Sequence, residues 1–410
     1  MRLMFLGDRI LGGTSAYSKL GYEICTRLVK SGHQVAHIPI GKVNRMGKQA
    51  YEGVLVYPSG DDYFGEDTAL ANYMDFKADM LITIKDTWVF NHVFKLGINF
   101  VPLAVIDHAP VSAAITSRLD TAFKIIAISR FGQIELRRRK IDSVYIPHAV
   151  RCDIYKPLSP DQKTQARRLF GLPPDAFVIG CVAMNRARKM ISRMLRGFKR
   201  FRDLNPDINA HMMLWTNIQP RRPAEDVTLG VSDVGVNLIP EIIDLGINEV
   251  VHWPDWDDVN KLGGLPECDP MGNWDMNKLY GTFDVNFLCS GGEGAGLTYL
   301  EANACGVPSV GTNYAAGPEY IGPGLTVSWH DYIIFNTPGV RYVLSDIDGM
   351  ALALRKIYDG DKEKMAKKCR KFAEGYDWNK IMSDYWTPFL RQCSEELYPL
   401  ITKEEAKSWA

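Results

Sequence analysis

The chain has 410 residues, and at about 100–200 residues per domain this length predicts two or three domains with ample core. It excludes a peptide hormone, a lone binding module and a disulfide-stapled miniprotein, while 46% hydrophobic and 23% charged residues exclude wholesale disorder. Lys plus Arg and Asp plus Glu both number 48, so the net charge is +0. The protein therefore lacks the overall positive charge expected of a generic nucleic-acid or anionic-membrane binder.

The cysteines and the hydropathy pattern bear on the compartment. Eight cysteines form neither a C-x-x-C pair nor a regular framework, which predicts free buried thiols in a reducing environment. No basic-then-apolar leader opens the chain, and its most apolar long stretch, residues 94–116, carries charges and two prolines. We therefore expect a soluble, cytoplasmic protein.

The first part of the chain alternates short apolar runs with amphipathic helical stretches, the pattern of βαβ units and parallel sheets. A strand at residues 2–6 leads through a glycine-bearing loop into a helix that Gly32 ends. Further strands are predicted at residues 35–38, 80–84, 101–106, 124–128 and 144–146. Residues 148–157 are predicted to cross into a second domain.

The alternation resumes after a polar helix at residues 160–170, which indicates a second doubly wound domain. Its predicted strands are residues 178–182, 212–215, 249–252, 285–288 and 308–311, and its predicted helices are residues 192–202, 276–281, 297–305, 348–359 and 362–374. Residues 219–236 and 253–274 are interpreted as long loops. We place the domains at 1–155 and 156–385, with a cleft between the carboxyl ends of their sheets, where open α/β sheets bind ligands.

The stretch SGGEGAGLTYLEANACGVP at residues 290–308 follows a buried strand and opens a helix. Its glycines allow backbone N–H groups to approach a ligand closely, and the helix that begins near Leu297 points its positive dipole end into the same loop, which favours a phosphate. Glu293 lies in the loop and Glu301 about one turn into the helix. Because carboxylates repel phosphate, we expect these two acids to bind sugar hydroxyls beside it.

This pattern closely resembles the E-x7-E motif of the retaining, GT-B-fold glycosyltransferases of family 4, the glycosyl transferases group 1, and the likeness covers roughly residues 1–390. The resemblance implies an α/β GT-B fold of two Rossmann-like doubly wound domains that face each other across a cleft. It implies that Glu301 binds the donor ribose and that Glu293 lies against the transferred sugar. Donor-binding roles near the diphosphate fall to Gly294, Ala295, Gly296, Leu297 and Thr298.

Two segments of the first domain fit the same family. Gly12 and Gly13, after the first strand, resemble the N-terminal loop that faces the donor phosphates or the acceptor, although G-x-G-x-x-G is absent and a tight turn without a ligand role stays open. His108, directly after the predicted strand at 101–106, matches the position of a family histidine near the transferred sugar; the alternative is an ordinary loop residue.

A basic segment follows the first strand of the second domain. A departing diphosphate gathers negative charge, and positive groups that meet this charge lower the barrier. The family uses a lysine and an arginine here; Lys189 matches the lysine, but Met184 occupies the arginine position, so Arg186 or Arg188 must substitute. The alternative is a solvated basic turn.

The remaining likenesses concern architecture. The family's interdomain crossing corresponds to residues 146–157, where the usual Asn-Gly is His148-Ala149. The resemblance also implies that residues 386–410 form a C-terminal helix packed back on the first domain. His33 and His37 bracket a strand start and lie too far apart for one metal, and we predict no metal site.

We therefore expect a retaining, metal-independent hexosyltransferase that moves a sugar from a UDP- or GDP-sugar to a hydroxyl of a glycan, lipid or other acceptor, with no further cofactor. The neutral charge argues against a nucleic-acid partner. The alternatives are a nucleotide-sugar epimerase or hydrolase of the same fold, and a noncatalytic nucleotide- or carbohydrate-binding protein. The intact pair of Glu293 and Glu301 argues against the noncatalytic alternative, while Met184 argues weakly for it.

Overall fold

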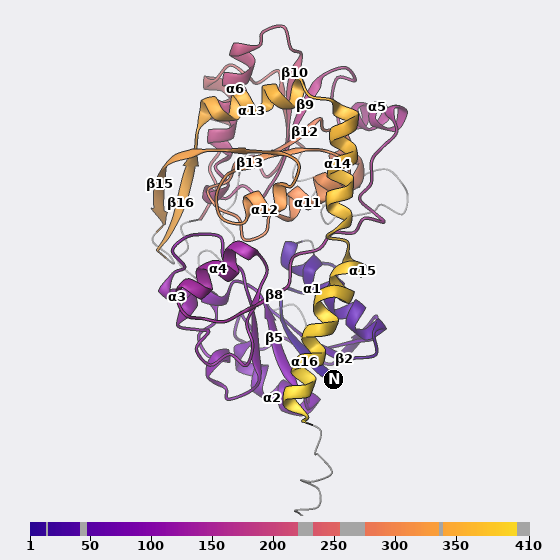
Figure 1. Ribbon diagram of the computed structural model, residues 1–410, viewed down its shortest axis with the longest axis vertical. Coiled ribbons are helices and arrows are strands. Elements are labelled where there is room, and N and C mark those ends of the chain that lie inside the picture. Colours follow the sequence, from indigo (N-terminus) through magenta and orange to yellow (C-terminus); the bar gives the residue numbers. More distant parts are fainter. Residues whose placement is uncertain (14, 42–46, 220–232, 255–274, 336–338, 400–410) are drawn as a thin grey trace, which may run out of the picture.

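The computed structural model of the chain describes residues 1–13, 15–41, 47–219, 233–254, 275–335 and 339–399. Figure 1 shows two α/β lobes, one above the other, each built on its own sheet. The N-terminal lobe is built on β1–β8, and the C-terminal lobe on β9–β14 together with the hairpin β15–β16.

The sheet of the N-terminal lobe has eight strands in the order β3-β4-β2-β1-β5-β6-β7-β8. The strands are β1 (Arg2–Gly7), β2 (Gln34–Pro39), β3 (Gln49–Tyr51), β4 (Val54–Val56), β5 (Met80–Ile84), β6 (Phe100–Ala104), β7 (Ile126–Ala127) and β8 (Val144–Tyr145). All neighbours pair in parallel except β3 and β4. The carboxyl ends of the parallel strands therefore meet at one edge of the sheet.

Helices cover both faces of this sheet, as a buried parallel sheet requires. They are α1 (Ala16–Lys30), α2 (Glu66–Phe76), α3 (Ala113–Thr116) and α4 (Arg130–Arg138), with the 3-10 turns η1 (Thr87–Val89) and η2 (Val93–Lys95). Alternate residues of β1 belong to different cores: Leu3 and Phe5 pack with α1, and Met4 and Leu6 pack in the cluster that contains α2.

The sheet of the C-terminal lobe has six parallel strands in the order β11-β10-β9-β12-β13-β14. Its strands are β9 (Phe177–Val182), β10 (Ala210–Trp215), β11 (Val251–His252), β12 (Val285–Leu288), β13 (Ser309–Thr312) and β14 (Leu325–Val327). The antiparallel hairpin of β15 (Trp329–Phe335) and β16 (Val340–Ser345) follows. The helical elements up to β14 are α5 (Pro160–Leu169), η3 (Ala187–Lys189), α6 (Ile191–Leu204), α8 (Ile239–Asp244), α10 (Met276–Gly281), α11 (Leu297–Ala304) and α12 (Gly317–Ile321).

The chain then returns to the N-terminal lobe. After α13 (Ile347–Tyr358) and α14 (Lys362–Glu374), the elements α15 (Trp378–Ile381), η4 (Met382–Trp386) and α16 (Thr387–Leu397) run along that lobe (Figure 1). The segment that leads from the first lobe to the second contacts the segment that leads back between α14 and α15, because Val150 N–H donates to the carbonyl of Tyr376 over 2.9 Å. Lys124 lies 2.7 Å from Glu396, which ties α16 to the N-terminal lobe; residues 400–410 of the predicted segment lie outside the described part.

The structure agrees with many of the predicted elements and adds others. β5, β12, α10 and α14 have the predicted bounds. The predicted strand at 101–106 ends earlier, at Ala104, so the residues that follow belong to a loop, and the one at 124–128 shrinks to β7. The hairpins β3–β4 and β15–β16 and the helix α2 were not predicted. The predicted loops at 219–236 and 253–274 lie mostly outside the described residues.

Two further expectations concern the whole chain. Every cysteine that the structure describes is buried and free, as expected; Cys268 lies outside the described residues. Among the described helices, none is both long enough and apolar enough to cross a bilayer.

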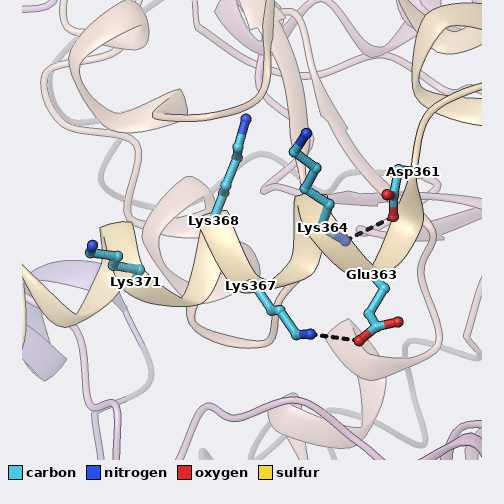
Figure 2. A pocket seen from close by; sticks show the side chains of 6 residues that line it. All are labelled: Asp361, Glu363, Lys364, Lys367, Lys368 and Lys371. Atoms are coloured by element: carbon cyan, nitrogen blue, oxygen red, sulfur yellow. Dashed lines mark hydrogen bonds and ion pairs between the residues drawn. The ribbon is translucent and has the colours of Figure 1, made fainter.

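A shallow hollow lies along α14, lined by lysines and two acids of that helix and its N-cap (Figure 2). Lys367 pairs with Glu363 over 2.6 Å, while Lys364, Lys368 and Lys371 also line it. The hollow contains none of the residues predicted for the interdomain site.

Candidate functional site

The glycine-rich loop connects β12 to α11 at the carboxyl edge of the C-terminal sheet. Gly296, its last residue, has φ +77°, a left-handed conformation that glycine adopts without strain. A Cβ there would also lie 2.4 Å from the Tyr299 ring. The loop therefore places the N-terminus of α11, with its unsatisfied backbone N–H groups, at the edge of the sheet that faces the other lobe. The buried hydroxyl of Thr298, in the first turn of α11, finds no hydrogen-bond partner among the described residues.

Two other glycines of the loop, Gly292 and Gly294, are required by contact with the N-terminal lobe. A Cβ on Gly292 would lie 2.2 Å from the backbone oxygen of Asp107, and one on Gly294 would lie 2.3 Å from Cγ1 of Val105. The sequence predicted that these glycines admit a ligand; the structure adds that they let the loop close on the residues after β6. The neighbouring Ala295 is buried.

Glu293, in this loop, forms a largely buried ion pair with Lys189. Nζ of Lys189 lies 2.6 Å from Oε1 of Glu293, and a guanidinium nitrogen of Arg188 lies 3.9 Å from Oε2. Burial by itself raises the pKa of Glu293, but Lys189 and Arg188 outweigh it, so the pKa lies below its ordinary value. Glu293 is therefore held as a carboxylate.

The two candidate arginines occupy different positions. Arg188 contacts Asp233 through both its backbone N–H, over 2.9 Å, and its side chain, over 3.2 Å, and it points a second nitrogen toward Glu293. Arg186 reaches the backbone oxygen of Asp233 over 3.4 Å. Burial alone lowers the pKa of Arg188, but the surrounding acids raise it above its ordinary value. Met184, at the expected arginine position, is exposed.

Glu301 is buried on α11 and held by two tyrosines. The Tyr155 hydroxyl donates to Oε1 over 3.0 Å, and the Tyr280 hydroxyl donates to Oε2 over 2.6 Å. Nζ of Lys19 lies 3.9 Å from Oε1. These contacts fix the orientation of the carboxylate at the wall of a hollow that Leu297 also lines.

His108 lies in the loop after β6, and both of its ring nitrogens are engaged. Nδ1 lies 2.7 Å from Oδ1 of Asp107, and Nε2 accepts the backbone N–H of Ser112 over 3.2 Å. Because Nε2 accepts, Nδ1 carries the proton and donates it to Asp107. The imidazole is thereby fixed and almost wholly buried.

Gly12 and Gly13 form the turn between β1 and α1. Gly12 has φ +64°, and a Cβ on Gly13 would lie 2.3 Å from both the Arg9 oxygen and Oγ of Ser18. Ser15 caps α1 by accepting the Ser18 N–H over 3.0 Å. This geometry explains both glycines as a tight turn, which was one of the two interpretations left open; a ligand role for them stays a prediction.

Sequence reasoning missed several residues that complete the site. Tyr155 was assigned to the interdomain crossing, and nothing in the sequence linked it or Tyr280 to Glu301. Asp233 lies in a segment interpreted as a loop, and Tyr342 lies on a hairpin that was not predicted. Asp233 is acidic and close in sequence to no predicted site residue, so only the fold brings it to Arg188.

The described residues contain no group of three or more His, Cys, Asp or Glu side chains that could hold a metal ion. The predicted residues of the C-terminal lobe instead converge on one edge: the glycine loop, Glu293, Lys189, Arg188 and, one turn further, Glu301. His108 joins them from the N-terminal lobe, because Gly292 packs on the backbone of its neighbour.

Comparison with protein families identifies part of the chain. Residues 231–369 match the model of the family described as Glycosyl transferases group 1. This match confirms the likeness to the glycosyl transferases group 1 over the segment that contains the glycine loop and both glutamates; membership of family 4 stays a prediction.

The curated relatives that match the chain are named as glycosyltransferases. The chain is 27% identical over 178 residues to D-inositol 3-phosphate glycosyltransferase of Stackebrandtia nassauensis, and 25% identical over 202 residues to the protein of that name from Actinosynnema mirum. These alignments cover 43% and 46% of this chain, but the chain spans only 35% and 42% of the length of the two relatives.

Solved structures match over nearly the whole chain. Sucrose-phosphate synthase from Thermosynechococcus elongatus aligns with TM-score 0.68 and 15% identity, over 96% of this chain and 99% of its own. Anabaena HepE, solved in complex with UDP and glucose, aligns with TM-score 0.67 and 14% identity, over 96% of this chain and 100% of its own. At these identities the likeness shows the fold, which is GT-B, as the resemblance implied.

Proposed function

We propose that this GT-B chain, whose residues 231–369 match the group 1 glycosyltransferases, is a retaining glycosyltransferase that moves a hexose from a UDP- or GDP-sugar to an acceptor hydroxyl. The observation that carries the proposal is the convergence of a glycine-lined helix start, two buried acids and a lysine at one edge between two facing sheets. Curated relatives named as glycosyltransferases and a neighbour solved with UDP and glucose support it.

The donor diphosphate would lie at the N-terminus of α11. Backbone N–H groups there carry partial positive charge and lack intrahelical acceptors, and the Thr298 hydroxyl lies in the same turn. Lys189 and Arg188 lie beside the loop, so positive charge faces the oxygen from which the sugar departs. These side chains, rather than a metal ion, would stabilise the leaving group.

Glu301 would bind the ribose. A carboxylate accepts hydrogen bonds from vicinal hydroxyls, and the two tyrosines that hold Glu301 fix the direction in which it does so. Glu293, kept ionised by Lys189, would support positive charge at the anomeric carbon. The departing diphosphate oxygen would take the proton of the acceptor on the face of attack, which retains the anomeric configuration without a side-chain base.

The test is binding and turnover with UDP-, GDP- and ADP-sugars. A ligand that binds the native state raises its apparent stability, so thermal shifts identify the donor. Glu301→Gln should weaken the binding of that donor by roughly 10- to 100-fold, since a hydrogen bond to a charged group contributes about 1.5–3 kcal/mol.

The matched control is Glu135→Gln, which changes a buried acid of α4 that pairs with Arg138, away from the loop. It should leave the donor affinity within about twofold of the original. Equal affinities for the original chain and Glu301→Gln would contradict the assigned ribose site. Nucleotide release without any acceptor would favour the hydrolase or epimerase alternative, and donor binding without turnover would favour the noncatalytic one.

A further inference from the structure

Two tyrosines of the C-terminal lobe hold the loop that carries His108. The Tyr342 hydroxyl donates to Oδ2 of Asp107 over 3.2 Å. The Tyr314 hydroxyl accepts the backbone N–H of Ala109 over 2.8 Å. The residues on either side of His108 are thus fixed from the opposite lobe.

Asp107 connects Tyr342 to the imidazole. One carboxylate oxygen of Asp107 accepts the proton on Nδ1 of His108, and the other accepts the hydroxyl of Tyr342. Since Nδ1 donates its proton to Asp107, the orientation and tautomer of His108 depend on how Asp107 is held. Because Tyr342 holds Asp107, the position of His108 also depends on Tyr342.

The hairpin β15–β16 places Tyr342 with little freedom. Tyr342 is 7% exposed, and its backbone pairs with Ile333 on β15. The backbone N–H of Val343 donates to the carbonyl of Gly291 over 2.9 Å, and a Cβ on Gly291 would lie 2.7 Å from Cβ of Tyr342. The hairpin therefore packs on the glycine loop, and its Tyr342 hydroxyl contacts the N-terminal lobe.

We propose that Tyr342 is a positioning residue for the transfer reaction: its hydroxyl reaches from the glycine loop to Asp107 and, through it, fixes His108 when the two lobes are closed. The inference rests on the proposed function, because it gives His108 its place beside the transferred sugar. It adds a residue that contacts neither predicted carboxylate and comes from the unpredicted hairpin.

The proposal has a pH consequence. The groups that face Asp107 are His108, Arg188, Tyr342, Tyr314 and Asp86. Burial raises the pKa of Asp107, but His108, Arg188 and Tyr342 together hold it below its ordinary value. Removing the Tyr342 hydroxyl removes one lowering contribution, so the pKa of Asp107 rises, and the ionised form that holds His108 is lost at a higher pH on acidification.

The experiment compares Tyr342→Phe with Tyr332→Phe, a change of an exposed tyrosine on the same hairpin. Tyr342→Phe keeps the ring and should lower kcat by roughly 10- to 100-fold, with little change in the donor KM, and should shift the acid limb of the kcat profile to higher pH. Tyr332→Phe should match the original chain in both. An unchanged kcat and acid limb in Tyr342→Phe would overturn the proposal.

A second readout does not depend on activity. In protein labelled with ¹⁵N-histidine, the His108 signals should report a proton on Nδ1, and Tyr342→Phe should change these signals, because Asp107 is no longer held by the hydroxyl. If no sugar nucleotide supports transfer, the proposed function fails. The positioning inference is then judged by these signals alone, and identical His108 signals across pH in both proteins would refute it.

Discussion

The ion pair of Lys189 and Glu293 links the proposed reaction to stability at the level of single residues. Both side chains are mostly buried, at 13% and 8% exposed, and their charged atoms are 2.6 Å apart. Charges taken out of water are tolerated when paired, and removing one partner leaves the other uncompensated. A change at Lys189 therefore affects the fold as well as the proposed reaction, and a test must separate the two effects.

Lys189→Met should lower the free energy of unfolding by about 3 kcal/mol, because buried Glu293 loses its nearest partner and keeps the more distant Arg188, 3.9 Å away. It should also slow sugar transfer by roughly 10²–10³-fold, the effect of losing one charge-stabilising group. Urea unfolding and steady-state kinetics measure the two effects.

The double variant Lys189→Met with Glu293→Gln separates them. Neutralising both partners should restore most of the lost stability while transfer stays slow. A double variant that recovers transfer along with stability would mean that neither the Lys189 nor the Glu293 charge is needed for transfer and that Lys189 acts only through the fold.

At the scale of elements, local sequence was enough where a strand is a short apolar run or a helix begins at a capping residue. β5 and β12 are short, wholly buried runs, and α10 is opened by Asp275, whose side chain accepts the Lys278 N–H over 2.6 Å. The hairpin β15–β16 did leave a signal, since residues 329–345 contain aromatic and β-branched runs around Asn-Thr-Pro-Gly. Its exposed apolar side chains lack the alternation expected of a half-buried strand, so the pattern was not recognised.

Asp284, just before β12, joins three elements. It accepts the N–H of Val178 on β9 over 2.8 Å and pairs with Lys163 and Arg167 of α5 over 2.9 Å and 2.6 Å. Burial raises the pKa of Asp284, but these contacts outweigh it and hold the pKa below 3.8. Since the pKa is lowered on folding, the ionised form stabilises the fold at pH above about 3.8, and this stability is lost as the pH falls through the lowered pKa.

Asp284→Asn should lower the free energy of unfolding at pH 7 by about 3 kcal/mol, because two cations lose a buried partner. The difference between the variant and the original should shrink on acidification below pH 3.8. Urea unfolding across this range measures both. Lys367→Met, at an exposed pair on α14 (Figure 2), should cause no measurable change; a pH-independent loss in Asp284→Asn would contradict the electrostatic explanation.

At the scale of the whole molecule, the two lobes are in contact with each other, which is a closed arrangement. Glu319 of α12 accepts the hydroxyl of Tyr145 over 2.6 Å and the backbone N–H of Arg130 over 2.7 Å, both from the N-terminal lobe. The Tyr320 hydroxyl accepts the backbone N–H of His148 over 3.1 Å. Together with the glycine loop these contacts bring the two carboxyl edges within reach of one ligand.

Gly292→Ala should hold the lobes apart. The added methyl would meet the backbone oxygen of Asp107 at 2.2 Å, and a backbone atom yields only if the lobes move. We expect a larger radius of gyration in X-ray scattering with donor present, together with slower transfer. Gly171→Ala is the control, since its φ of +67° is strained by a side chain but the added Cβ meets no atom within 4 Å. An unchanged radius of gyration in Gly292→Ala would show that closure does not depend on this contact.

Local sequence was enough to predict the two α/β sheets, the glycine loop at a strand end and the pair Glu293 and Glu301, because alternation, glycine placement and helix starts are set by neighbouring residues. Which side chains hold these acids and the His108 loop follows from the packing of the folded chain. Tyr155, Tyr280, Asp233 and Tyr342 reach their partners from distant parts of the chain. Such contacts depend on how elements pack across the two lobes, and no local pattern encodes that packing.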